Sequence, residues 1–436
     1  MENKIETISG NNLKDNFDEP WKLRQKTSFR FAFLFLGLTS IINWHLSIFF
    51  SYIAWFKPSF DIAVLFHFFA AQFYWIDKYI FHSGYDPKIH ASFPQDNHFA
   101  TVFYLTVFLI SCIGSILWGV IGRNKINYNK LFFWFNIYLR YTLAITMIGY
   151  GLIKFIPVQM SWPSVSSMLT PYGEHSRFDV LWNFMGVSPG YMRLTGGFEI
   201  IGGLLLLSRR TTLFGYLFLL TILINVVALN WFYNVPVKMY STQLMVYNLF
   251  LLAPYANKLF HFFYYNKIII AHEKQYYIKT TWKKNSFISI LVFIPLLFLL
   301  SQGLGAYKRF SKDALDKKSE KLYNVTYFIA TDTLPPLTTD TLCWKRLMIR
   351  GNTVVVCNMK DEMDYYDCDV DSTKHSFTFH DNPDTATWKV FQYAYPSKDE
   401  LQLTGKWKEK DIKVLMKSSP IDSMYLNKEE IKLVQD

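Results

Sequence analysis

The sequence predicts an α-helical integral membrane bundle of about seven transmembrane helices, followed by a C-terminal antiparallel β-barrel or sandwich. Hydrophobic residues make up 51% of the 436 residues and charged residues only 18%, against about 25% charged residues in soluble proteins. Seven apolar runs approach the roughly 20 residues that cross the hydrocarbon of a bilayer. After residue 320 the pattern changes to short alternating runs, which are typical of strands.

The first part of the chain, residues 1–28, is polar, and its basic residues precede an apolar run at about 29–50. That run is too long for the apolar part of a signal peptide, and no cleavage site of small residues follows it. We therefore expect an uncleaved anchor. With a second span at about 99–121, it forms a region of two spans over residues 29–131.

Residues 60–76 lie between these two spans and are also apolar. Asp61, His67 and Gln72 interrupt this stretch, and a full crossing would place the basic loops that follow on the opposite side of the membrane. We interpret the stretch as a re-entrant or interfacial helix, with an eighth span as the alternative.

Residues 132–257 contain four further apolar runs with short polar connections. A basic loop, residues 258–285, and a last span, residues 286–304, precede the tail. The four runs lie at about 132–156, 191–207, 212–231 and 241–257.

The basic residues predict the orientation. With the N-terminus inside, the short inner segments hold fifteen Lys and Arg residues, and the outer segments with the start of the tail hold eight. Cytoplasmic loops carry such an excess. We predict a multi-pass protein of a bacterial-type inner membrane, with a cytoplasmic N-terminus and an extracytoplasmic domain at residues 305–436. The net charge of +11 comes from the membrane part, so the expected partner is the lipid bilayer and not nucleic acid.

The tail contains eight short runs of alternating polarity, separated by turn residues, and this pattern is typical of an antiparallel barrel or sandwich. The alternation predicts that Trp344, Arg346 and Met348 share one face of their strand, and that Trp388, Val390 and Gln392 share a face of another. The expected strands are 323–330, 344–349, 353–359, 365–370, 375–380, 387–394, 401–407 and 411–416.

Three motifs follow one another within residues 139–250. LRYTLAITMIGYGLIKF contains Tyr-Gly-x-x-Lys, GGFEIIGGLLLLSRRTTLFG contains Gly-x-x-Glu-x-x-Gly before Arg-Arg, and NVVALNWFYNVPVKMYS contains an Asn…Pro-Val-Lys hairpin. This order resembles the DoxX-like four-helix membrane module. The tail, which includes Leu-Thr-Gly-Lys-Trp, is similar to small lipocalin-like barrels. The DoxX-like resemblance implies a membrane-associated complex of sulfur, thiol or quinone redox chemistry, and it names no reaction.

Within the spans of this module, Arg140, Lys154 and Glu199 are ionisable. A charge at mid-bilayer costs roughly 2.5–3.5 kcal/mol on insertion scales, so such residues usually face a bundle interior and have partners. Lys154 either extends to the headgroups or forms, with Arg140, a cationic column that orients an anionic or quinone-like ligand. Glu199 is either a counter-ion or a proton carrier.

The middles of the two spans place Arg140 and Glu199 at similar depths. We therefore predict that they pair directly, through Tyr150 or through a water molecule. Asn230 and Lys238 bracket the next hairpin, where they either line the mouth of the module or are interfacial polar residues. The candidate ligand-binding residues are Arg140, Tyr150, Lys154, Glu199, Asn230 and Lys238.

Histidines recur every eight residues in the first outer loop, with aspartates between them. This spacing matches no zinc-ligand pattern, so we expect solvated loop residues and no metal. The residues concerned are His82, Asp86, His90, Asp96 and His98.

The four cysteines form no Cys-x-x-Cys motif, so thioredoxin-like chemistry is not indicated. Cys112 lies alone in a span and is expected to be a packing residue. Cys343, Cys357 and Cys368 lie in the tail, where one disulfide with one spare thiol is an open alternative.

No phosphate loop, hydrolase triad or zincin motif is present, so the sequence identifies no enzyme activity. Two functions stay open. The first is a membrane subunit of a quinone-, thiol- or sulfur-linked redox complex; the sequence shows no cofactor motif, and quinone is the candidate ligand. The second is a non-enzymatic envelope binding or assembly protein whose barrel holds an apolar ligand or a protein partner.

Overall fold

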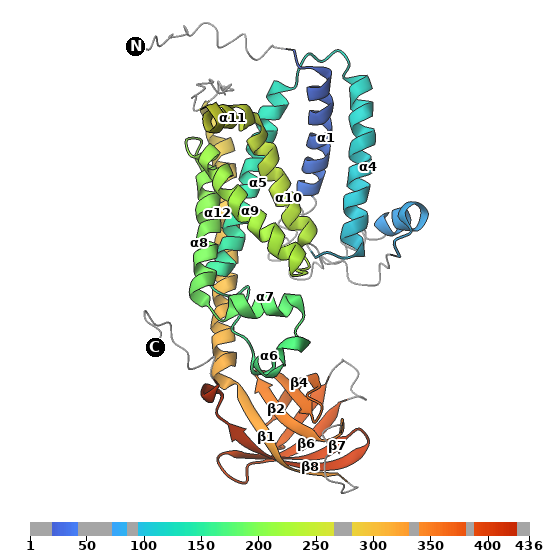
Figure 1. The fold of residues 1–436 in the computed structure, drawn as a ribbon, viewed down its shortest axis with the longest axis vertical. Coiled ribbons are helices and arrows are strands. Elements are labelled where there is room, and N and C mark those ends of the chain that lie inside the picture. Colours follow the sequence, from blue (N-terminus) through green and yellow to red (C-terminus); the bar gives the residue numbers. More distant parts are fainter. Residues whose placement is uncertain are drawn as a thin grey trace. The chain divides into compact units, whose positions relative to one another are not determined.

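The structure is a computed structural model that describes residues 20–41, 72–84, 95–265, 281–330, 340–380 and 388–424. The chain divides into two compact units. The helical unit comprises Met1–Ile156 and Gly190–Gly305, and the barrel unit comprises Pro157–Pro189 and Ala306–Asp436. Figure 1 shows the helices of the first unit and the strands of the second.

The described part of the helical unit consists of helices and helical turns. They are α1 (Leu23–Ser40), the π-helical turn η4 (Asp77–Phe81), α4 (His98–Ile121), α5 (Asn129–Phe155), α8 (Pro189–Leu207), α9 (Thr212–Phe232), α10 (Lys238–Leu252), the 3₁₀ turn η6 (Ala253–Tyr255) and α11 (Ala256–Tyr265). The next helix, α12, runs over Thr281–Ser319.

Three helices in the described part of the chain are long and apolar enough to cross a membrane: α4, α5 and α9. The described residues thus support three of the seven predicted spans. Two of the other predicted spans correspond to a shorter or a more polar helix: α10 has only 15 residues, and α8 contains Arg193 and Glu199. The last predicted span lies within the 39-residue helix α12. The predicted helix at 60–76 and the end of the first span lie largely outside the described residues.

The core of the helical unit lies where α1, α5, α9 and α10 meet. Leu139 and Leu143 of α5, Leu219 of α9 and Tyr247 of α10 are at most 1% exposed, and all belong to one buried cluster. α1 packs against α4 and α5 (Figure 1). The apolar faces that the sequence spaces at helical intervals therefore meet one another here.

The second unit contains a closed, up-and-down antiparallel barrel in which each strand pairs with its neighbours along the chain and β1 pairs with β8. The predicted barrel is confirmed, and the sandwich is not. Its strands are β1 (Lys321–Ala330), β2 (Trp344–Arg350), β3 (Thr353–Asn358), β4 (Met363–Asp371), β5 (Ser376–His380), β6 (Lys389–Ala394), β7 (Glu400–Trp407) and β8 (Lys410–Ser419). A 3₁₀ turn, η8 (Ile421–Ser423), follows.

Aromatic side chains occupy much of the barrel interior. The ring centroid of Trp344 lies 5.1 Å from that of Trp407 and 5.7 Å from that of Phe391. An eight-stranded barrel has an interior just wide enough for side chains to fill.

The prediction that Trp344, Arg346 and Met348 share a face is wrong. The register of β2 against β3 shifts between Trp344 and Arg346, and such a bulge moves the following residues to the opposite face. Trp344 packs in the barrel interior, whereas Met348 belongs to a second cluster on the outer surface.

That second cluster joins the barrel to the segment between α5 and α8. The segment contains α6 (Val165–Leu169), the 3₁₀ turn η5 (Tyr172–Glu174) and α7 (Arg177–Gly186). Val165 is 0% exposed because it packs on outward-facing side chains of β1, β2 and β3. These are Leu322, Met348, Val355 and Cys357.

Candidate functional site

Lys154 and Glu199 form an ion pair inside the helical unit. The Lys154 ammonium donates a hydrogen bond to Glu199 Oε1, and the two residues are 9% and 2% exposed. Glu199 Oε2 is buried and has no hydrogen-bond partner among the described residues. Buried intramembrane charges are usually paired and mark functional sites.

Glycines let the two helices of this pair approach closely. A Cβ added at Gly151 would lie 2.6 Å from Gly196 O, and a Cβ added at Gly203 would lie 2.7 Å from Ala144 O. α5 and α8 are therefore antiparallel, with backbone in contact on both sides of Glu199. This register brings Lys154 to the carboxylate.

The predicted pair of Arg140 with Glu199 is wrong. Gly203 faces Ile148 and Gly196 faces Lys154, so Glu199 lies between these levels, and Arg140 is at least about 12 Å further along α5. Arg140 Nη1 instead lies 3.5 Å from Thr212 Oγ1, and its Cζ lies 5.2 Å from the Tyr141 ring centroid. The buried Arg140 Nε has no partner among the described residues.

Tyrosines extend the polar environment of the ion pair. Tyr150 interacts electrostatically with Glu199, and its ring centroid is 6.2 Å from that of Tyr240. Tyr150 thus lies near the pair, but it does not bridge Glu199 to Arg140, the role that we predicted as one alternative, because Glu199 pairs directly with Lys154.

A chain of polar side chains joins α4, α10 and α1. Tyr104 donates to Gln243 Oε1 at 2.5 Å, Gln243 donates to the Tyr247 hydroxyl, and that hydroxyl is 3.2 Å from Thr39 Oγ1. Sequence reasoning missed these residues. Their signal was the presence of polar side chains within apolar runs.

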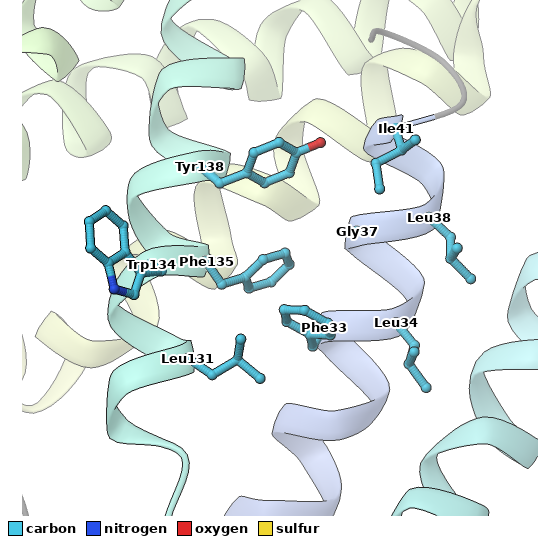
Figure 2. Close-up of a pocket in the computed structure, with 9 residues that line it drawn as sticks. All are labelled: Phe33, Leu34, Gly37, Leu38, Ile41, Leu131, Trp134, Phe135 and Tyr138. Atoms are coloured by element: carbon cyan, nitrogen blue, oxygen red, sulfur yellow. The ribbon is translucent and has the colours of Figure 1, made fainter. Parts of the chain in front are cut away.

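An open groove of about 340 Å³ lies between α1 and α5. Figure 2 shows the ring of Tyr138 reaching from α5 toward Ile41 of α1. The Tyr138 hydroxyl donates to Ser40 Oγ at 2.9 Å, and Trp134 adds an indole N–H to the otherwise apolar lining. The lining residues are Phe33, Leu34, Gly37, Leu38, Ile41, Leu131, Trp134, Phe135 and Tyr138.

The structure does not bring Lys238 to the ion pair. Lys238 Nζ lies 3.6 Å from Asp96 Oδ2, and the same carboxylate accepts from the backbone N–H groups of Lys238 and Met239 at 2.6 and 3.0 Å. Asp96 thereby caps the N-terminus of α10. Asn230 is 9% exposed. Its backbone carbonyl accepts a hydrogen bond from Val235 N at 2.9 Å, which closes the hairpin between α9 and α10.

No group of three His, Cys, Asp or Glu side chains suited to a metal ion occurs in the part of the chain that the structure describes. His82, Asp96 and His98 lie in that part, whereas Asp86 and His90 lie outside it.

All four cysteines are free, so the alternative of one disulfide in the tail does not hold. Burial raises the pKa of Cys343 and of Cys368 to about 12, and it also raises the pKa of Cys357. A thiol that stays protonated at neutral pH is a poor nucleophile. The barrel thiols are therefore packing residues.

No family model matches the chain, and no solved structure matches it. Over 116 residues, which are 26% of this chain and 71% of the other, it is 34% identical to a Bacillus subtilis (strain 168) protein described as "Uncharacterized protein YwoB". The chain belongs to the family of YwoB. The matched stretch covers most of the relative, whose description names no ligand or reaction.

Proposed function

We propose that the helical unit is a membrane subunit that binds a quinone-like hydrophobic ligand within a redox complex. The observation that carries this proposal is the groove between α1 and α5. Its lining side chains are apolar apart from the Tyr138 hydroxyl and the Trp134 indole N–H, and α5 is apolar enough to cross a membrane. Ligand sites usually combine apolar walls with a few well-placed polar groups.

The chemistry of the groove suits an isoprenoid ligand with an oxygenated ring. The apolar side chains fit the hydrocarbon tail, and the Tyr138 hydroxyl, which donates to Ser40 Oγ, can accept a hydrogen bond from a hydroxyl group on the ligand ring. Quinone reduction takes up protons. Buried ionisable residues such as Lys154 and Glu199 are typical of proton paths in membrane proteins.

The DoxX-like resemblance supports the same proposal, and the charge asymmetry of the loops supports its placement. We propose that the chain crosses a bacterial-type inner membrane seven times, with the N-terminus in the cytoplasm and the barrel outside.

Quenching of tryptophan fluorescence by a quinone with a ten-carbon tail tests the proposal on the full chain in phosphatidylcholine nanodiscs. We expect saturable quenching, because Trp134 lines the groove. A Cβ added at Gly37 would lie 3.7 Å from Phe135, which is ordinary contact. Gly37→Leu should therefore fill the groove and weaken binding about tenfold or more, a loss of roughly 1.4 kcal/mol or more.

Gly149→Leu is the matched control, because a Cβ at Gly149 meets no atom within 4 Å and Gly149 does not line the groove. Its affinity should equal that of the wild type. Absence of saturable quenching in the wild type, or equal affinities in the two variants, would contradict the proposal.

The barrel supports a second candidate, non-enzymatic binding of an apolar ligand with an anionic head. The indole nitrogens of Trp344 and Trp407 are buried and have no acceptor among the described residues. Lys389 Nζ lies 4.2 Å from the Tyr366 ring centroid and 5.3 Å from that of Trp407. These groups offer donors and a cation to one acceptor-rich head.

Isothermal titration calorimetry of the full chain with octanoate, an apolar chain with an anionic head, tests this second candidate. Lys389→Gln should abolish the binding heat, whereas Lys398→Gln, which removes an exposed charge, should preserve it. No heat in the wild type would refute the candidate, and an envelope protein partner of the barrel would then become the better alternative.

A further inference from the structure

Arg30 is a buried cation without a carboxylate partner among the described residues. The side chain lies in α1 and is 4% exposed. Its one hydrogen bond within the described chain runs from Nε to the Tyr128 hydroxyl, at 3.1 Å. Burying an unpaired charge is costly, so this arrangement indicates that an anion from outside the chain completes the site.

The surroundings of Arg30 form a built cradle. Its Cζ lies 5.3 Å from the Tyr128 ring centroid, and Tyr128 itself packs against Trp118, with ring centroids 5.4 Å apart. A Cβ added at Gly119 would lie 3.0 Å from Arg30 Nη1, so this glycine makes room for the guanidinium. A guanidinium has five N–H donors, and the described residues engage only the one on Nε.

The described stretches that contain Arg30 and its contact residues carry only basic charges. Residues 20–41 and 97–131 contain no Asp or Glu. Lys26 Nζ donates to the Lys125 carbonyl at 2.7 Å, which joins the start of α1 to the connection between α4 and α5. The other basic side chains of these two stretches are Lys22, Arg24, Arg123 and Lys130.

The outer face of α4 beside this cradle is apolar. Ile116, Val120 and Ile121 are 66%, 68% and 85% exposed, and they flank Gly119 in sequence. α4 is one of the helices that can cross a membrane. An anion here therefore lies next to a surface that suits hydrocarbon chains.

We propose that Arg30 binds the phosphate of an anionic phospholipid, with Lys26 and Lys125 beside it and the acyl chains along α4. Arg30 offers a fork of donors that matches phosphate oxygens, and basic pockets between membrane helices are general sites for anionic headgroups. The site is distinct from the groove and does not depend on a quinone-like ligand.

Thermal unfolding of the detergent-solubilised full chain tests the site. Titration with phosphatidylglycerol should raise the Tm, because a ligand that binds only the folded state stabilises it. The apparent affinity should exceed that for phosphatidylcholine by roughly fivefold, the effect of about one basic residue near a lipid surface. Inorganic phosphate at the same concentration should leave the Tm unchanged.

Arg30→Gln should abolish the preference for phosphatidylglycerol, whereas Arg24→Gln, which removes an exposed charge from the same helix, should retain it. Gly119→Val keeps the charge and displaces the guanidinium, so it should also abolish the preference, and it serves if Arg30→Gln does not fold. Equal Tm shifts with both lipids, an equal shift with inorganic phosphate, or equal losses in the Arg24 and Arg30 variants would overturn the proposal.

Discussion

Lys154 and Glu199 stabilise the helical unit mainly by neutralising each other. Each charge would be costly alone at this depth of burial. The pair has a direct hydrogen bond, but Glu199 Oε2 has no partner among the described residues. The pair is therefore only partly satisfied, which suits a site that exchanges protons or contacts a ligand.

Lys154→Met and Glu199→Gln should each destabilise the full chain by about 3–5 kcal/mol, because each leaves a buried group without its partner. The double variant should recover much of the loss. Unfolding of the purified protein in detergent measures the three effects. Arg140→Gln is the control and should show no coupling with Glu199→Gln. Additive effects of the Lys154 and Glu199 substitutions would refute the pair.

At the scale of elements, the backbones of α5 and α8 come into contact at Gly196. A Cβ there would lie 2.6 Å from Gly151 O and 2.7 Å from Phe155 N, and backbone atoms cannot move aside as a flexible side chain can. The neighbouring Gly197 meets no atom within 4 Å. The two adjacent glycines thus differ sharply in what they tolerate.

Gly196→Leu should separate α5 from α8, break the Lys154–Glu199 pair and lower stability by about 1–3 kcal/mol or more. Gly197→Leu adds the same side chain one position away and should be nearly neutral. Tm values of the two variants in one detergent provide the comparison. Similar losses in both would show that helix propensity, not close approach, is responsible.

The contact of α6 with the barrel depends on a carboxyl group. Glu320 Oε1 accepts from Val165 N at 2.9 Å. Burial raises the pKa of Glu320, although the Val165 N–H, Arg350 and Lys317 lower it in part, and Asp313 raises it further. The folded chain therefore holds this proton more tightly than the unfolded chain does.

The protonated Glu320 carboxyl group therefore makes its full contribution to stability below its pKa in the unfolded chain, which is about 4.3. This contribution is lost as the pH rises through the higher pKa that the group has in the folded chain. We expect the Tm of the wild type to fall, relative to Glu320→Gln, as pH increases from about 4 to 7. Glutamine keeps an acceptor for Val165 N and does not ionise. A difference between the two proteins that stays constant over this range would contradict the expectation.

At the scale of the whole molecule, the basic loops predict that the barrel lies outside the cytoplasm. Protease added to intact spheroplasts of a bacterial host should then remove residues 305–436 and leave the helical unit protected. Cleavage only after the membrane is broken would reverse the orientation.

The barrel should fold when residues 318–436 are expressed alone, because a closed barrel has no free edge. The fragment lacks α6, however, and so exposes the apolar surface around Leu322 and Met348 that Val165 covers. We expect a β-rich circular dichroism spectrum and a Tm that rises when a peptide of residues 157–189 is added. A helical or disordered spectrum would refute the expectation that the fragment folds alone. A Tm that the peptide leaves unchanged would refute the expectation that residues 157–189 bind the barrel.

The strands of the barrel could be predicted from the pattern of polar and apolar residues alone. Their alternation is a local property, since neighbouring side chains of a strand point to opposite faces wherever the strand lies. Polarity likewise identified Lys154 and Glu199 as residues that need partners, because a charge is costly in an apolar helix whatever surrounds it.

Which partners these two residues have depends on how the helices pack against each other. The pairing of Glu199 with Lys154 depends on the register of α5 against α8, which glycine contacts along both helices set and no single helix contains. The same holds for Trp344 and Met348, which a bulge between paired strands separates, and for Val165, which packs on strands distant in sequence. Register and docking depend on the fit of two surfaces, and the residues of one surface do not specify the other.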